Sequence, residues 1–139
     1  SLNYLQNGEE LRTVFSKVQN FLTPGGLFFF DINSLYKFEK LYGDNTYVFE
    51  GNGGYCVWQN RYKKSKKQCD FLLTIFKAEK DGLYSRHEEE QRQCYFSPAS
   101  LEKTLKETGF ELILKGRDYR GGPLQEKDGD IFYLAVCRK

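Results

Sequence analysis

The chain has 139 residues, of which 40% are hydrophobic and 17% aromatic, and this is enough for one domain with its own core. Its 21 basic and 19 acidic residues leave a net charge of +2, which argues against a dedicated nucleic-acid-binding domain. No stretch approaches the roughly 20 apolar residues of a membrane span, and the first residues show no signal-peptide pattern. We therefore expect a cytoplasmic protein with no membrane partner.

Cysteine and histidine usage predicts no metal site. Histidine occurs once, and the cysteines show no CxxC spacing; they are Cys56, Cys69, Cys94 and Cys137. Two disulfides are arithmetically possible, but free and partly buried thiols suit a reducing compartment better. The chain contains no methionine and opens directly on SLNYL, so we expect a fragment of a longer protein. A recombinant or processed chain would explain the missing start residue equally well.

The first predicted elements are a helix and a buried strand. Apolar residues recur at helical spacing over residues 8–22, with Asn7 as N-cap and Glu10 at the return position of a capping box. TPGG then ends the helix, because proline cannot continue it and glycine permits positive φ. The strand 27–31 begins with the run LFFF. Since this run has no polar side, we expect both of its faces to be buried, as in a sheet covered by helices.

Asp31 closes that strand and is a candidate site residue. Ligands of open α/β sheets bind outside the carboxyl ends of the strands, where Asp31 would lie. The alternative is a purely local role, in which Asp31 caps the next segment through Asn33 or Ser34. Residues 34–42 are predicted to form a short helix.

Residues 46–96 have a different character and predict an antiparallel meander that is inserted into the α/β layer or appended to it. Their β-rich runs are separated by the turn signals GNGG, KKSKK and KDG. In the last run, Arg86 and Glu88 belong to a row of alternate residues with the charges plus, minus, minus, plus. This row could bind a polar acceptor, or it could be a solvated face with internal charge pairs. The basic run at 61–67 is typical of a solvated hairpin tip, although it could also touch RNA phosphates.

The α/β pattern returns after residue 96. Ser97 and Pro98 suit the N-cap and first position of a helix that Gly109 ends. The segment FELILKG alternates in polarity and suits a sheet edge, whereas the nearly all-apolar segment 130–137 predicts a central strand.

This order of elements resembles the C-terminal part of a class I S-adenosylmethionine-dependent methyltransferase, of the small bacterial type with an antiparallel β insertion. The motifs that carry the resemblance span almost the whole chain: SLNYL (1–5), FLTPGGLFFFDINSLYKFE (21–39), Trp58, RHEEEQRQCYFS (86–97), LEKTLKETGFE (101–111) and IFYLAVCRK (131–139). The resemblance implies an α/β fold, namely the C-terminal half of a three-layered, Rossmann-like methyltransferase sheet. Residues 1–45 and 97–139 would belong to that α/β domain, and 46–96 would be the insertion.

The resemblance also assigns strands and site residues. Strands 27–31, 110–115 and 130–137 would be the fifth, sixth and seventh of the sheet, side by side, with the last one antiparallel. The segment beside the cofactor S-adenosylmethionine would contain Ser1, Leu2, Asn3 and Tyr4. Asp31 would lie on the substrate side, and the insertion would cover the acceptor pocket or form a homodimer contact. Tyr4, Tyr36 and Trp58 could form an aromatic wall for a cationic sulfonium or ammonium, with plain core packing as the alternative.

The family's glycine-rich cofactor loop and ribose-binding acidic residue are absent from these 139 residues. Where relatives often have an arginine before the last strand, this chain has Asp128-Gly129-Asp130. We therefore expect the parent protein to transfer a methyl group from S-adenosylmethionine to a small molecule, and the fragment alone to be inactive. The sequence identifies no catalytic residue. The alternative is a stand-alone α+β module that binds a ligand or a protein without catalysis.

Overall fold

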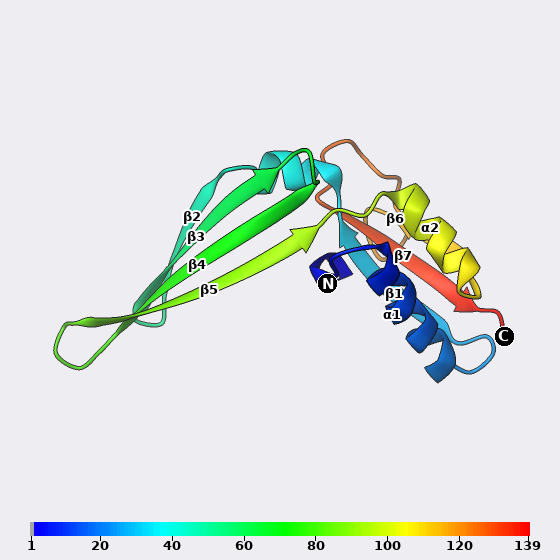
Figure 1. Ribbon diagram of the computed structural model, residues 1–139, viewed down its shortest axis with the longest axis horizontal. Helices are drawn as coiled ribbons and strands as arrows, with labels where there is room; N and C mark the ends of the chain where they lie inside the picture. Colours follow the sequence, from blue (N-terminus) through cyan, green and yellow to red (C-terminus); the bar gives the residue numbers. More distant parts are fainter. Residues whose placement is uncertain (1) are drawn as a thin grey trace.

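The computed structural model describes residues 2–139, which form two antiparallel sheets and a few helices (Figure 1). The first sheet has the order β1 (Leu27–Asn33), β7 (Asp130–Cys137), β6 (Phe110–Gly116). The second has the order β2 (Thr46–Gly51), β3 (Gly54–Lys63), β4 (Gln68–Ala78), β5 (Tyr84–Cys94). The helical elements are η1 (Leu2–Tyr4), α1 (Gly8–Phe21), the π-helix η2 (Lys37–Tyr42) and α2 (Pro98–Glu107).

Strand β7 lies at the centre of the first sheet and runs antiparallel to both neighbours. Asp31 pairs with Phe132 and Asn33 with Asp130, so the carboxyl end of β1 lies beside the start of β7. β6 is an edge strand, and a register shift between Leu112 and Leu114 interrupts its alternation. The predicted central and edge strands, and the predicted antiparallel last strand, are confirmed.

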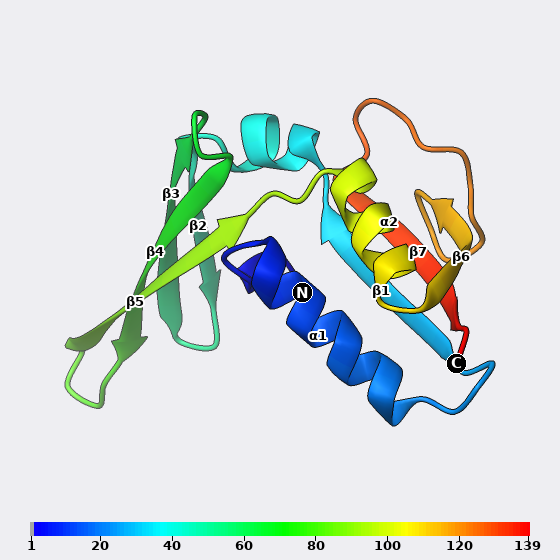
Figure 2. The ribbon, with the colours of Figure 1, turned by 45° about the vertical axis from the view of Figure 1, so that its right-hand side comes forward.

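Helices α1 and α2 lie together on one face of this sheet (Figure 2). The predicted caps are present: Asn7 accepts a hydrogen bond from the backbone N–H of Glu10 at 2.9 Å, and Ser97 from that of Ser100 at 3.3 Å. Gly109 ends α2 with a φ of 84°, which favours glycine. Both helices bury apolar side chains against the sheet, and the core comprises Leu11, Phe15, Phe30, Ile32, Leu101, Leu105, Phe110, Ile131, Tyr133 and Ala135 among others.

The opposite face of the sheet is more open, which corrects one expectation. Leu27 and Phe29 are 58% and 44% exposed, so the prediction that both faces of this strand are buried is wrong at these positions. The physical reason is that α1 and α2 cover only one side. On the other side Phe29 is contacted by the ring of Tyr119, from the loop after β6, at 5.3 Å. The second helix layer implied by the resemblance is not found within residues 2–139.

The second sheet extends away from the first (Figure 1) and is joined to it by η2 and by the end of β5. Phe38 and Tyr42 of η2 are buried against Cys69 and Phe71 of β4, with Trp58 of β3 packed on this cluster. The four strands follow one another in sequence, so the predicted meander is confirmed. All four cysteines are free, three of them buried and Cys56 half-buried. No helix within residues 2–139 has the length and apolar character to span a membrane.

The packing of α1 predicts a sharp contrast between two phenylalanines of the same helix. Phe15 is fully buried, and the centre of its ring lies 5.6 and 5.5 Å from the ring centres of Phe28 and Phe30. Phe21, by contrast, is 89% exposed. Phe15→Ala should lower the free energy of unfolding by about 3–5 kcal/mol, because it removes a core ring and leaves a cavity. Phe21→Ala, the matched control, should change it by less than about 0.5 kcal/mol. Urea denaturation measures both, and equal losses would contradict the assigned core.

Candidate functional site

Buried side-chain amides join the two sheets where β1 ends. The Asn3 side chain donates to the backbone oxygen of Cys94 at 2.9 Å and accepts from the backbone N–H of Asn33 at 2.8 Å. Asn33 in turn donates to Gln93 Oε1 at 2.7 Å and to the Tyr42 hydroxyl at 3.2 Å. Asn3, Asn33 and Gln93 are each less than 10% exposed. This amide network fixes η1, the end of β1, η2 and the end of β5 relative to one another.

A cavity of about 410 Å³ opens directly beside this network. This volume lies within the range of small-molecule sites, and its walls come from both sheets, η1, η2 and the loop after β6. Its lining residues are Tyr4, Asp31, Asn33, Lys37, Tyr42, Gln93, Tyr119, Asp130 and Phe132. The structure thus brings together two residues predicted from sequence, Tyr4 and Asp31, at the carboxyl end of β1. We take this end-of-β1 cavity as the candidate site.

The charges of the end-of-β1 cavity do not cancel. Lys37 Nζ lies 2.8 Å from Asp130 Oδ1, so these two charges neutralise each other. The carboxylate of Asp31 is half-buried and has no hydrogen bond or ion pair with any residue of the described chain. Burial, and next the nearby Asp130 carboxylate, raise the pKa of Tyr42 far above its usual value. Tyr42 therefore stays a neutral phenol, and the cavity keeps one excess negative charge.

Of the first segment of the chain, which the resemblance assigns to the cofactor, only Tyr4 among the described residues lines the cavity. Asn3 is buried in the amide network, and Leu2 packs against the core of the first sheet. Tyr4 is 46% exposed and donates its hydroxyl hydrogen to Gln91 Oε1 at 2.8 Å. Ser1 lies outside the described residues. The assignment of this segment to the cofactor therefore stays a prediction.

Tyr36 and Trp58 do not line the end-of-β1 cavity. Tyr36 is half-buried at the start of η2. Trp58 contacts the ring of Phe71 at 5.5 Å and that of Tyr42 at 6.1 Å, which places it one ring behind the cavity wall. Its indole N–H is buried and has no hydrogen-bond partner among the described residues. Their roles in substrate binding stay predictions, and the observed contacts of Trp58 are those of core packing.

Arg86 and Glu88 lie on the other face of β5 from Gln91 and Gln93, and they form an ion pair with each other. Further along the same face, Arg92 and Lys63 both pair with Asp70. The hydrogen bond from Arg92, and then that from Lys63, lowers the pKa of Asp70 to about 2. The structure therefore does not bring Arg86 and Glu88 to the cavity, and it shows internal charge pairs on the row that the sequence singled out.

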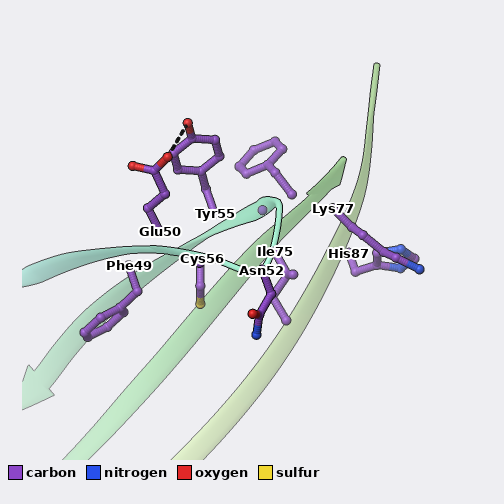
Figure 3. A pocket seen from close by; sticks show the side chains of 11 residues that line it. Phe49, Glu50, Asn52, Tyr55, Cys56, Ile75, Lys77 and His87 are labelled. Atoms are coloured by element: carbon purple, nitrogen blue, oxygen red, sulfur yellow. Dashed lines mark hydrogen bonds between the residues drawn. The ribbon is translucent and has the colours of Figure 1, made fainter. Parts of the chain in front are cut away.

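A second cavity, of about 450 Å³, lies at the far end of the four-stranded sheet. Figure 3 shows Phe49, Cys56 and Asn52 on one side of the strands, with Tyr55 and Glu50 on the other. Phe49, Cys56, Ile75 and His87 are cross-strand neighbours in one row. This hollow is mainly apolar, and none of the residues predicted for the site lines it. We therefore place the candidate site at the end of β1.

Sequence reasoning missed much of the cavity wall. Nothing in the local sequence distinguishes Tyr42, Gln93 and Phe132 from ordinary strand or helix residues. Tyr119 lies in a loop of irregular sequence. Asp130 was noticed only as part of the departure at Asp128-Gly129-Asp130. These residues meet through contacts between segments that are distant in sequence, and the periodicity of apolar residues along the chain does not predict such contacts.

The amide network predicts a large cost for removing its central member. Asn33→Ala would remove the side-chain amide that donates to Gln93 and Tyr42 and would leave the buried Gln93 oxygen without this donor, so the free energy of unfolding should fall by about 2 kcal/mol. Asn20→Ala, at an exposed position of α1, is the matched control and should change it by less than about 0.5 kcal/mol. Urea denaturation at neutral pH measures both, and a neutral effect of Asn33→Ala would contradict the structural role of the network.

The ion pairs of Asp70 predict a pH dependence of stability. Because the pKa of Asp70 is lower in the folded protein than its usual value near 4, this carboxylate stabilises the fold above about pH 4. The contribution is lost as the pH falls toward 2. Asp70→Asn should therefore cost about 1 kcal/mol at pH 6, and the difference from the wild type should vanish near pH 2. Urea denaturation across this range tests it, with Asp81→Asn as the control; a pH-independent difference would exclude the ion pairs as its cause.

Comparison with known proteins gives the same fold and family resemblance. No protein-family model matches the chain. It is 29% identical over 135 residues to a relative from Geobacillus sp. (strain WCH70) and 27% identical over 139 residues to one from Bacillus subtilis (strain 168), both named "Putative methyltransferase". These alignments cover 97% and 100% of this chain but 55% and 56% of the relatives. The chain thus spans about half the length of the curated relatives that it matches.

Solved structures agree over the same extent. A S-adenosylmethionine-dependent methyltransferase from Clostridium acetobutylicum ATCC 824 matches with a TM-score of 0.88 and 26% identity, over 100% of this chain and 55% of that one. The CcbJ methyltransferase from Streptomyces caelestis matches with a TM-score of 0.77 at 14% identity, over 98% of this chain and 56% of that one, which shows the fold alone. The predicted resemblance is therefore confirmed: over its whole length this chain is similar in sequence and fold to about half of a S-adenosylmethionine-dependent methyltransferase.

Proposed function

We propose that this chain is the acceptor-side, C-terminal part of a protein that transfers a methyl group from S-adenosylmethionine to a small molecule. The observation that carries the proposal is the whole-chain match to the clostridial S-adenosylmethionine-dependent methyltransferase, with a TM-score of 0.88 and 26% identity. The end-of-β1 cavity supports it, because ligands of α/β sheets bind outside the carboxyl ends of strands.

The described residues fit one side of the cofactor only. η1 passes beside the cavity, and the half-exposed ring of Tyr4 is available to a cationic sulfonium. The glycine-rich turn and the carboxylate that would hold the rest of the cofactor do not occur in this sequence. We therefore infer that the 139 residues alone bind the cofactor weakly and do not catalyse.

S-adenosylmethionine, when bound, supplies an electrophilic methyl group, and its transfer requires positioning more than acid–base chemistry. The chain's own residues can position the reactants because the amide network fixes η1 against the end of β1. Tyr4 and Asp31 are therefore held at a constant separation. Tyr42, as a neutral phenol, can donate a hydrogen bond to an acceptor oxygen or nitrogen in the cavity.

We further propose that residues 46–96 act as an acceptor-side insertion in an α/β unit formed by residues 1–45 and 97–139. Gln93 of β5 lines the cavity directly, and Trp58 supports Tyr42 from behind. A homodimer contact through this sheet is a second prediction, and size-exclusion chromatography with light scattering on the protein from its complete coding sequence tests it.

The experiment for the proposed function is calorimetric titration of S-adenosylmethionine into the protein expressed from its complete coding sequence. We expect saturable binding there and at least tenfold weaker binding to the 139 residues alone, since these supply only one side of the site. Tyr4→Ala should weaken binding about fivefold, because an aromatic face near the sulfonium is lost. Tyr84→Ala, which removes a similarly exposed ring (50%) at the far end of β5, is the matched control. No binding to the complete protein would contradict the proposal.

A further inference from the structure

The chemistry of the end-of-β1 cavity points to a class of acceptor. Two carboxylates, Asp31 and Asp130, and one cation, Lys37, line it. Lys37 forms an ion pair with Asp130, with 2.8 Å between Nζ and Oδ1, and its Nζ lies 5.8 Å from the centre of the Tyr42 ring. The unpaired charge is therefore that of Asp31.

Aromatic rings lie next to that unpaired carboxylate. Asp31 and Phe132 are direct cross-strand partners in an antiparallel pair, so their side chains share one face of the sheet. The ring of Tyr119 packs on Phe132 at 4.8 Å and on Phe29 at 5.3 Å, and it is 72% exposed. The core of α1 and α2 is on the other face, so these rings remain open to a ligand.

A tightly built turn holds Tyr119 in this position. The Asp118 carboxylate accepts hydrogen bonds from the backbone N–H groups of Arg120 and Gly122 at 2.9 and 3.0 Å. Gly121 has a φ of 76°, and a Cβ there would lie 2.6 Å from Leu114 Cδ1. The turn therefore packs closely against β6 and fixes the backbone from which the Tyr119 ring reaches Phe29 and Phe132.

A carboxylate beside aromatic faces is the arrangement that recognises organic cations, by charge and by the ring quadrupole. We propose that the end-of-β1 cavity binds an acceptor that carries an ammonium group next to a flat or apolar body, with Asp31 holding the ammonium and Tyr119 and Phe132 holding the body. This inference rests on the proposed function, since it names the substrate class of the same site.

The sulfonium of the cofactor is the other cation that could approach Asp31. Its charge is lost in S-adenosylhomocysteine, a neutral thioether. A carboxylate that serves the sulfonium would therefore favour S-adenosylmethionine over S-adenosylhomocysteine, whereas one that serves the acceptor would leave the ratio of these affinities unchanged.

The test uses benzylammonium and benzyl alcohol as probes, which differ mainly in charge, with the protein from its complete coding sequence. Affinities come from NMR titration of its backbone amide signals. We expect benzylammonium to bind about fivefold more tightly than benzyl alcohol. Asp31→Asn should reduce that ratio to about one, whereas Glu111→Gln, which removes an exposed carboxylate of β6 outside the cavity, should keep it. Tyr119→Ala should weaken both probes, and Tyr119→Phe should preserve both affinities because the ring remains.

Three results would overturn the inference: equal affinity for the two probes, no binding of either, or a preference that survives in Asp31→Asn. A lowered ratio of S-adenosylmethionine to S-adenosylhomocysteine affinity in Asp31→Asn, with the probe preference intact, would assign the carboxylate to the sulfonium instead. Failure of the wild type to bind S-adenosylmethionine, with the probe preference present, would contradict the methyltransferase proposal and leave the cation site standing.

Discussion

The buried hydrogen bonds of Asn33 hold the two sheets and η2 in one arrangement. This residue closes β1, yet its side chain faces Gln93 of the second sheet and Tyr42 of η2, and its backbone N–H is held by Asn3. Four segments, namely η1, β1, η2 and β5, thus share one buried network. Because an unpaired buried amide costs free energy, each partner holds the others in place. The cavity lies beside this network and is lined by residues of both sheets.

The two faces of the first sheet differ in how closely their side chains are packed. The face under α1 and α2 is filled by apolar side chains, and mutations there should act on stability. The other face carries Asp31, Phe132 and Tyr119, which lie around the cavity and are only partly covered. Such a division is typical of α/β proteins, in which a rigid core positions polar groups at strand ends and in loops.

Local signals predicted much of the fold. The caps at Asn7, Ser97 and Gly109 depend on neighbours within a few residues, and all three are present. Burial of Leu27 and Phe29 was predicted wrongly, because an apolar run does not reveal whether a chain supplies helices for both faces. The site was predicted only at Tyr4 and Asp31. Gln93, Tyr119 and the Lys37–Asp130 pair join it through contacts between distant segments, and no periodicity encodes those contacts.

Hydrogen–deuterium exchange of the complete protein, with and without S-adenosylhomocysteine, would show where the cofactor binds. We propose that the cofactor lies against η1, with Asp31 on the acceptor side. We therefore expect slower exchange in residues 2–5 when this compound is bound, with little change at the far end of the second sheet around residues 79–83. Unchanged exchange in residues 2–5, or protection confined to the far end of the second sheet, would contradict this placement.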